Sequence, residues 1–340
     1  MPLLNFFRRF LKSLRGKTTR RSQRREGAAA LVGGLEQRTL LVAFSEFVDP
    51  NPATGNQFGH SVVPLSTGNV VITSPFDDAG GTDAGAVYLF NGATGALIST
   101  LTGSHTNDTV GSGGVTALNN GNYVVSSSSW NNQGVIGQGF GAVTWGSGTT
   151  GISGAVTAAN SLVGSTAGDH VGILGVTALS NGSYVVSSFL WDNGDIVNAG
   201  AVTWGSGTGG ISGAVTAANS LVGSTLGDQV GHYGVTALIN GNYLVSSVAW
   251  DNGGVADAGA VTWGSGTAGI SGPVSATNSL VGSTATDNVG RGGVTALSNG
   301  NYIVSSFVWD NGGAVDAGAV TWGNGTTRSE EHTSELQSPC

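Results

Sequence analysis

Residues 221–279 read LVGSTLGDQVGHYGVTALINGNYLVSSVAWDNGGVADAGAVTWGSGTAGISGPVSATNS, and this stretch decides the fold because the chain repeats it. One set of tryptophans recurs every 59 residues, namely Trp145, Trp204, Trp263 and Trp322. A second set recurs at intervals of 61, 59 and 59 residues, namely Trp130, Trp191, Trp250 and Trp309. Self-similarity at a fixed period of this length indicates a repeat architecture. We therefore predict four copies of one unit between residues 105 and 327.

Short apolar runs and turn residues alternate within this stretch. The pattern predicts strands at 234–238, 243–250, 258–263 and 272–280. Asn240-Gly241 between the first two is a strong hairpin signal. Four strands in about 59 residues, without helical periodicity, are typical of one blade of a β-propeller. We predict an all-β chain that forms a truncated β-propeller of four-stranded blades. The alternative is a β-solenoid array, in which the repeats stack without closing.

Composition agrees with a folded β array. Glycine fills 59 of the 340 positions, against a usual level of about 7%. Hydrophobic residues make up 39% of the chain, and disordered chains lack that much apolar material. The glycines are therefore expected in turns. The only cysteine is Cys340, so the repeats have neither disulfides nor thiolate metal sites.

Charge divides sharply along the chain. Residues 1–42 contain ten Lys or Arg and two Glu, whereas residues 43–327 contain fifteen Asp or Glu and a single base, Arg291. An acidic body of this kind repels nucleic acid and anionic lipid, so we expect no nucleic-acid partner. No run of residues approaches 18 apolar positions, the minimum for a transmembrane helix.

Residues 58–95 carry a family resemblance. They begin with Phe58-Gly59, end a predicted second strand at Ser74-Pro75 and continue with an apolar strand at 85–90. This pattern resembles the FG-GAP repeat, the blade unit of integrin-α-type propellers. The later copies resemble a diverged bacterial relative, with Val-Gly in place of Phe-Gly. The resemblance implies an extracellular propeller that binds a ligand and holds calcium in acidic turns.

The two ends of the chain differ from the repeats. Residues 3–14 place apolar side chains at helical spacing among Arg and Lys, so membrane contact is expected only there. Residues 35–41, LEQRTLL, resemble the LEPR-XLL motif near the amino terminus of large secreted planctomycete proteins. A basic, disordered tail is the alternative to this export-type leader. Residues 328–338 resemble the translation of a sequencing adapter, so we expect an artefactual tail and a longer natural protein.

These patterns divide the chain into segments. We predict a basic leader at 1–42, an FG-GAP-like first repeat at 43–104 and an artefactual tail at 328–340. The four variant repeats are expected at 105–161, 162–220, 221–279 and 280–327.

The acidic turns between the second and third predicted strands are the candidate calcium sites. Carboxylate and amide oxygens are the ligands that Ca²⁺ prefers. The candidate ligands are Asp77, Asp78, Asp83, Asp192, Asn193, Asp195, Asp251, Asn252, Asp257, Asp310, Asn311 and Asp316. The alternative is that the Asp side chains cap backbone amides in tight turns. A second recurring acid is expected to cap a turn or to bond to the adjacent blade, and it occurs as Asp108, Asp169, Asp228 and Asp287.

Comparison of the copies with one another indicates a candidate binding rim. The copies differ around the Val-Gly step, and variable positions on a constant scaffold are where a binding surface is encoded. The candidate rim residues are His170, His232, Tyr233 and Arg291. Surface drift is the alternative. The tryptophans are expected to pack between blades rather than to stack on sugars.

Enzymatic motifs are lacking. The sequence contains no Gly-x-Ser-x-Gly elbow, no His-Glu-x-x-His and no Walker-type loop. We therefore expect a non-catalytic binding or adhesion module of a larger secreted or cell-surface protein, with an unidentified protein or glycan ligand. A structural stalk and a propeller enzyme that acts on polysaccharide are the alternatives.

Overall fold

The computed structural model describes residues 46–131 and 137–326. The chain divides into two compact units, residues 1–46 and 47–340, and all described strands belong to the second. The described residues contain no helix, which confirms the all-β prediction. The predicted leader at 1–42 and tail at 328–340 lie outside the described residues.

The strands form five sheets, which we call blades 1 to 5 in chain order. Blade 1 consists of β1 (Ser61–Pro64), β2 (Asn69–Ser74), β3 (Ala86–Asn91) and β4 (Leu97–Thr102). Blade 2 consists of β5 (Val115–Ala117), β6 (Tyr123–Ser127), β7 (Ala142–Gly146) and β9 (Ser161–Val163). Blade 3 consists of β10 (Val176–Ala178), β11 (Tyr184–Ser188), β12 (Ala201–Gly205) and β14 (Ser220–Val222). Blade 4 consists of β15 (Val235–Ala237), β16 (Tyr243–Ser247), β17 (Ala260–Gly264) and β19 (Ser279–Val281). Blade 5 consists of β20 (Val294–Ala296), β21 (Tyr302–Ser306) and β22 (Ala319–Gly323).

Blades 1 to 4 each contain four antiparallel strands, as predicted, and a further strand joins three of them. The fourth predicted strand, at 272–280, is corrected, because it is two separate strands. Asn278 Oδ1 accepts a hydrogen bond from Ser275 N, and Asn278 Nδ2 donates to Pro273 O, both at 2.9 Å. This turn splits the segment, so the first part pairs in parallel with the outer strand of the preceding blade. We call these two-residue strands clasp strands, and they are β8 (Gly154–Ala155), β13 (Gly213–Ala214) and β18 (Gly272–Pro273).

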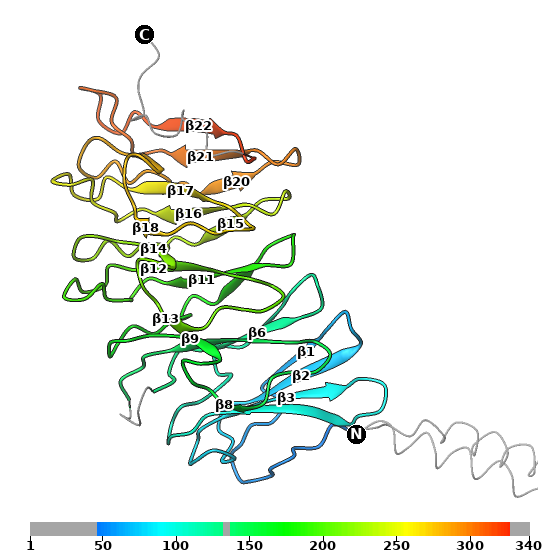
Figure 1. The fold of residues 1–340 in the computed structure, drawn as a ribbon. Coiled ribbons are helices and arrows are strands. Elements are labelled where there is room, and N and C mark those ends of the chain that lie inside the picture. The colour runs from blue at the N-terminus through cyan, green and yellow to red at the C-terminus, as the bar shows by residue number, and fades with distance from the viewer. Residues whose placement is uncertain (1–45, 132–136, 327–340) are drawn as a thin grey trace, which may run out of the picture. The chain divides into compact units, whose positions relative to one another are not determined.

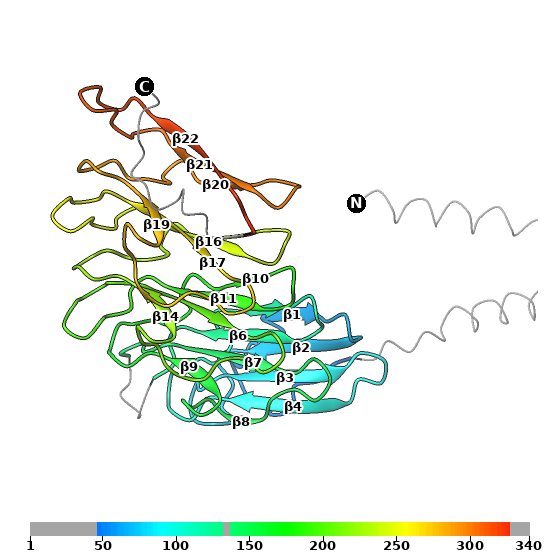
Figure 2. The ribbon, with the colours of Figure 1, turned by 45° about the horizontal axis from the view of Figure 1, so that its top comes forward.

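The blades follow one another in chain order in both ribbon views (Figures 1 and 2). The inner strands β1, β5, β10, β15 and β20 lie side by side. None of the five sheets is closed, and within the described residues no strand pairing joins blade 5 to blade 1. The fold is therefore a β-repeat array with propeller-type blades, and the described strands do not form a closed ring.

The hydrophobic core lies between the blades rather than within them. At the contact of blades 3 and 4, Val202 and Leu221 from one blade pack with Tyr243 and Trp250 from the next, and all four are at most 3% exposed. Full burial of such a side chain stabilises the fold by about 1.5–3 kcal/mol. Since a blade cannot bury both of its faces alone, the array is held together by contacts between successive repeats.

The Val-Gly step has a specific packing role. Val230 is fully buried, and Gly231 follows it with a φ of +82°. A Cβ atom at Gly231 would lie 2.3 Å from Cγ2 of Val202 in the preceding blade. Only glycine fits this close approach, so the Val-Gly step fixes the spacing between two blades.

Candidate functional site

The positions predicted to form the binding rim lie at one end of the blades. Each inner strand begins at the loop that follows the Val-Gly step, and the antiparallel second strand returns to that same end. In blade 4, Ser246 N donates to Gly234 O at 3.1 Å, which ties the loop to the end of the second strand. We call this end the variable rim. It is made of the loops after the Val-Gly step and the turns between second and third strands.

An aromatic cluster on the variable rim spans two blades. The imidazole of His232 in blade 4 stacks on the ring of Phe189 in blade 3, with 4.4 Å between centroids and 15° between planes. The ring of Tyr233 contacts His232 edge-on, with centroids 5.5 Å apart, and Tyr233 is 53% exposed. His232 and Tyr233 are exposed, and exposed aromatic rings offer flat surfaces on which a sugar or another planar group can stack.

The neighbouring blade presents a second aromatic residue with a cation. Arg291 lies over the ring of Phe307, with Cζ 6.0 Å from the centroid, and Nη1 donates to Asn288 Oδ1 at 3.1 Å. Phe307 is 56% exposed. A guanidinium over an aromatic face is attractive by about 0.5–1 kcal/mol at exposed sites. The pair therefore places the only Lys or Arg of residues 43–327 against an exposed aromatic ring on the rim.

The four predicted rim residues differ in their exposure to solvent. His232, Tyr233 and Arg291 are exposed, whereas His170 is half-buried and its Nδ1 contacts the carbonyl oxygen of Ser128 in the preceding blade at 2.9 Å. His170 thus links two blades. Sequence reasoning missed Phe189 and Phe307, which complete the two aromatic contacts.

These missed residues carry a signal in the sequence. They occupy the second position before the buried tryptophan of their copies, and this position varies between copies just as the predicted rim does. Its occupants are Ser128, Phe189, Val248 and Phe307. Comparison of the copies at this position would have found both aromatic residues.

The acidic turns lie at the same end, and their carboxylates cap backbone amides. Oδ1 of Asp192 accepts from Asn198 N at 2.7 Å, and Oδ1 of Asp251 accepts from Asp257 N at 2.8 Å. The corresponding pairs are Asp310 with Asp316 N and Asp78 with Asp83 N. The side-chain amides of Asn193 and Asn252 donate to Gly223 O and Gly282 O, each of which directly follows the outer strand of the same blade. In each of these turns one carboxylate therefore closes the turn by accepting a backbone amide.

These turns offer fewer free oxygen ligands than calcium usually takes. Calcium takes six to eight oxygens, and one oxygen of each capping carboxylate already accepts an amide. Among the described residues, no group of three or more His, Cys, Asp or Glu is arranged to hold a metal ion. Blade 2 has the uncharged Asn131 at this position, and its Oδ1 accepts from Gln138 N and Gly139 N. The geometry supports the turn role, and calcium binding by these turns stays a prediction.

The second recurring acid joins each repeat to the next blade, as predicted. The carboxylates of Asp108, Asp169, Asp228 and Asp287 are fully buried. Oδ2 of Asp169 accepts from Ser165 N and Thr166 N, both at 2.8 Å, and Oδ1 accepts from Asp192 N at 3.0 Å. Burial raises the pKa of Asp169 above its ordinary value, and the backbone amides that bond to it oppose the shift. This carboxylate fixes the turn that carries Asp192.

The tryptophans have two structural roles. Trp130, Trp191, Trp250 and Trp309 are buried between blades. The tryptophans of the other set bond to the next blade. The indole Nε1 of Trp145 in blade 2 donates to Gly207 O in blade 3 at 3.0 Å. Trp204 and Trp263 repeat this bond with Gly266 and Gly325. Inter-blade packing of these tryptophans is therefore confirmed.

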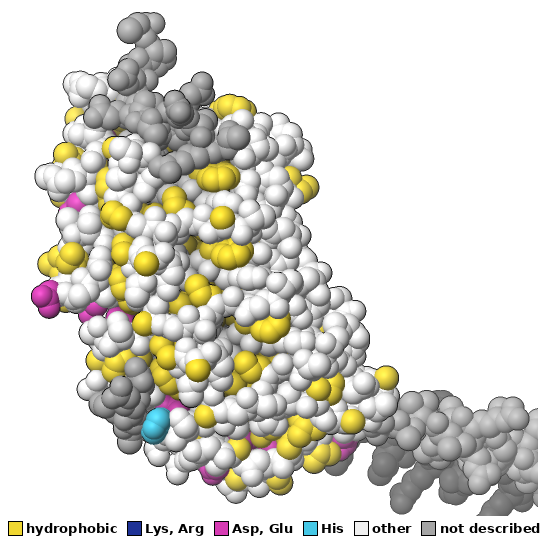
Figure 3. Space-filling view, in the orientation of Figure 1, with side chains coloured by type: hydrophobic (Ala, Val, Ile, Leu, Met, Phe, Trp, Pro, Cys, Tyr) yellow, Lys and Arg dark blue, Asp and Glu magenta, His cyan; other side chains and the backbone are white. Residues whose placement is uncertain are grey.

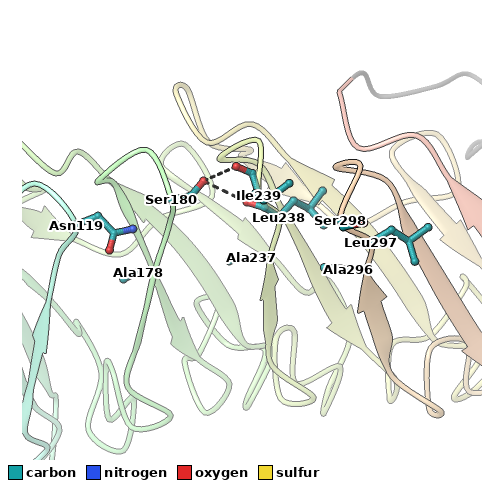
Figure 4. Close-up of a pocket in the computed structure, with 9 residues that line it drawn as sticks. All are labelled: Asn119, Ala178, Ser180, Ala237, Leu238, Ile239, Ala296, Leu297 and Ser298. Carbon is teal, nitrogen blue, oxygen red and sulfur yellow. Dashed lines mark hydrogen bonds between the residues drawn. The ribbon is translucent and has the colours of Figure 1, made fainter.

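A groove lies at the other end of the blades, opposite the variable rim. It has a volume of about 560 Å³ and runs over the hairpins between the first and second strands (Figure 4). Asn119 Nδ2 donates to Leu179 O at 3.1 Å, and Ser180 Oγ donates to Ile239 O at 2.9 Å. The side chains that line it therefore join consecutive hairpins, and they include no acid, base or nucleophilic cysteine.

The distribution of side-chain types on the surface follows the repeat. On the face that Figure 3 shows, acidic side chains lie along the left margin and across the lower end, and hydrophobic side chains recur from one blade to the next. Among the residues that the structure describes, there is no helix with the length and apolar character needed to cross a membrane.

Comparison with known families finds four repeats with the same period. A family described as a repeat of unknown function (DUF5650) matches residues 117–173, 178–232, 237–291 and 296–338, which together exceed half of the chain. The chain therefore belongs to this repeat family, and the four copies predicted from the tryptophan spacing are confirmed. The FG-GAP repeat matches residues 44–90, which confirms the resemblance of the first repeat. A comparison with curated proteins found no match.

Proposed function

We propose that this chain is a non-catalytic repeat module that binds a protein or a glycan at a cell surface through its variable rim. The observation that carries the proposal is the cluster of Phe189, His232 and Tyr233, in which two blades contribute to one exposed aromatic surface. Tyr and Arg side chains are enriched among the residues that contribute most to binding, and Tyr offers a large contact area at a low cost in conformational entropy.

The proposal places the protein outside the cell, as a secreted or surface-attached chain. An FG-GAP repeat in blade 1 supports this location. An acidic surface does not suit nucleic acid. Membrane contact is proposed only for the basic leader.

Binding to immobilised polysaccharides and to intact bacterial cells tests the proposal. We expect the purified full chain to bind at least one of these probes. The double substitution His232→Ala and Tyr233→Ala should weaken that binding by about tenfold or more, because both rings leave the surface. The matched control is Ile239→Ala, which removes an exposed side chain at the opposite end of blade 4 and should leave binding unchanged. Equal loss in both variants would overturn the rim as the binding surface.

A structural stalk is the second candidate, and the open row of blades favours it. A stalk gains rigidity from stacked repeats and has no specific ligand. Its signature would be an unbranched rod in electron micrographs together with no rim-dependent binding. The enzymatic alternative would show turnover of a polysaccharide that persists in the rim variant.

A further inference from the structure

Blade 5 exposes a face that each earlier blade buries against its successor. The valine at one position of the third strand is at most 3% exposed in blades 2, 3 and 4, where it is Val143, Val202 and Val261. In blade 5 the corresponding Val320 is 74% exposed. We define the open face as the side chains of Leu297, Ile303, Val320 and Trp322.

The open face also repeats the hydrogen-bonding chemistry of the buried faces. In blades 2 to 4 the indole of the third-strand tryptophan donates to a glycine carbonyl of the next blade, as Trp263 does to Gly325 at 3.2 Å. Trp322 occupies the same position in blade 5 and is 54% exposed. The open face thus has the same apolar and polar groups as the faces of blades 2 to 4 that the next repeat of the chain covers.

At the opposite end of the array, residues 47–56 cover most of the first face of blade 1. The first face is the face that, in each later blade, packs against the preceding blade. Phe47 packs on Phe90 with ring centroids 5.2 Å apart. Asn51 Nδ2 donates to Asp77 Oδ1 at 3.0 Å, and Tyr88 donates to Asp77 Oδ2 at 2.6 Å. Tyr88 and Phe90 are at most 3% exposed, although the described residues contain no blade before them.

Asp77 marks this difference in the sequence. It occupies the position at which blades 2 to 5 bury a tryptophan, since Gly85 N bonds to its carbonyl as Gly141 N bonds to that of Trp130. The first face of blade 1 therefore has a carboxylate where the later blades have an indole, and this carboxylate already accepts hydrogen bonds from Asn51 and Tyr88. Terminal repeats of arrays are capped by polar replacements of this kind.

Blade 1 also lacks the clasp. In blade 2, residues 152–160 separate Gly151 from the outer strand, and they include the clasp strand Gly154–Ala155. In blade 1 the outer strand begins at Leu97, two residues after the corresponding Gly95. Blade 1 therefore has no segment that could pair with an outer strand in front of it. Its first face is open only near the inner strand, where Val62 is 55% exposed.

We propose that the array is capped at blade 1 and that the open face of blade 5 is the docking site for one further copy of the same 59-residue repeat. The occupant follows from continuity with an interface that the chain already forms between each pair of neighbouring blades. Blade 1 of the same chain or of a second copy does not fit the site, because it has neither a clasp strand nor a free first face. The array grows in one direction and does not close through blade 1.

A chain extended by one repeat tests this proposal. Residue 327 corresponds to residue 268 of the preceding copy, so a second copy of residues 269–327 is placed directly after Thr327. Hydrogen exchange of a peptide that spans β22 is compared in the original and extended chains. We expect exchange to slow by about tenfold or more in the extended chain, because β22 changes from an end strand to an interior one.

Val320→Asp is the matched variant. It should leave the unfolding transition of the original chain unchanged, because Val320 is exposed there, and it should abolish the added protection in the extended chain. Unchanged exchange in the extended chain would overturn the proposal. A dimer of the original chain that Val320→Asp converts to a monomer, measured by light scattering, would also overturn it, because the occupant would then be a second copy.

Discussion

The indole Nε1 of Trp204 donates a hydrogen bond of 3.0 Å to the carbonyl oxygen of Gly266 in the next blade. The same carbonyl accepts Asn181 Nδ2 at 2.7 Å. Two donors from blade 3 therefore meet on one glycine carbonyl of blade 4, at the end of the blades opposite the variable rim. This contact gives each repeat a specific register on its neighbour, in addition to the non-directional apolar packing between them.

Trp204→Ala should lower the free energy of unfolding by about 2–4 kcal/mol, because it removes a half-buried indole and its hydrogen bond. Trp322→Ala is the matched control in the same sequence context. Trp322 is 54% exposed, so its loss should cost less than about 1 kcal/mol. Chemical denaturation followed by circular dichroism checks both values. Equal effects of the two substitutions would contradict a role for Trp204 between blades.

The sequence allowed the repeat and its strands to be predicted because both rest on local patterns. The tryptophan spacing gave the period, and Asn240-Gly241 marked a hairpin that the structure contains between β15 and β16. The clasp strand at Gly272–Pro273 was not predictable in this way. Its hydrogen-bonding partner is Leu221-Val222 of the preceding blade, and no local pattern encodes a parallel pair that distant in sequence.

The candidate rim was predicted in part for a similar physical reason. His232 and Tyr233 stand out when the copies are compared, because they interrupt a glycine-rich loop. Phe189 lies 43 positions before His232, and their stacking arises only when blades 3 and 4 pack together. Sequence reasoning missed the capping of blade 1, because the sequence places Asp77 in an acidic turn like the others. In the structure Asp77 is buried and accepts a hydrogen bond from Asn51.

Asp169 should make the stability of the fold depend on pH. Because burial raises its pKa in the folded state, the folded chain holds this proton to a higher pH than the unfolded chain does. Its contribution to the free energy of unfolding is therefore full below the unfolded pKa of about 3.9 and falls as the pH rises through the folded value.

Asp169→Asn isolates this contribution. At neutral pH the variant should be less stable by about 1–3 kcal/mol, because an amide cannot accept all three backbone N–H bonds. The stability difference between the original chain and the variant should widen as the pH is lowered toward 4, as measured by thermal unfolding across a pH series. A difference that narrows over that range would show that the carboxylate is more easily ionised in the fold than in the unfolded chain.

The acidic turns should tolerate loss of charge. Asp192→Asn and Asp251→Asn leave an oxygen that can cap the turn amide, as Asn131 does in blade 2, so each should change the free energy of unfolding by less than about 0.5 kcal/mol. The unfolding temperature of the original chain should be the same in millimolar calcium and in a chelator. Calcium-dependent stabilisation that both substitutions abolish would instead establish these turns as metal sites.

The hairpins opposite the variable rim offer a stabilising substitution. Asn119 and Ser180 each bond to a carbonyl of the following hairpin, whereas blade 4 has Ile239 at this position, which cannot donate and is 66% exposed. Ile239→Ser should therefore add a hydrogen bond from blade 4 to blade 5 and raise the free energy of unfolding by about 0.5–1.5 kcal/mol. Ser180→Ile, the reverse change one blade earlier, should lower it by a similar amount. Hydrogen exchange in β21 reports the expected gain directly, because blade 5 has a described neighbour only on its blade 4 side. No gain in Ile239→Ser together with a loss in Ser180→Ile would mean that the hairpins of blades 4 and 5 lie too far apart for this bond.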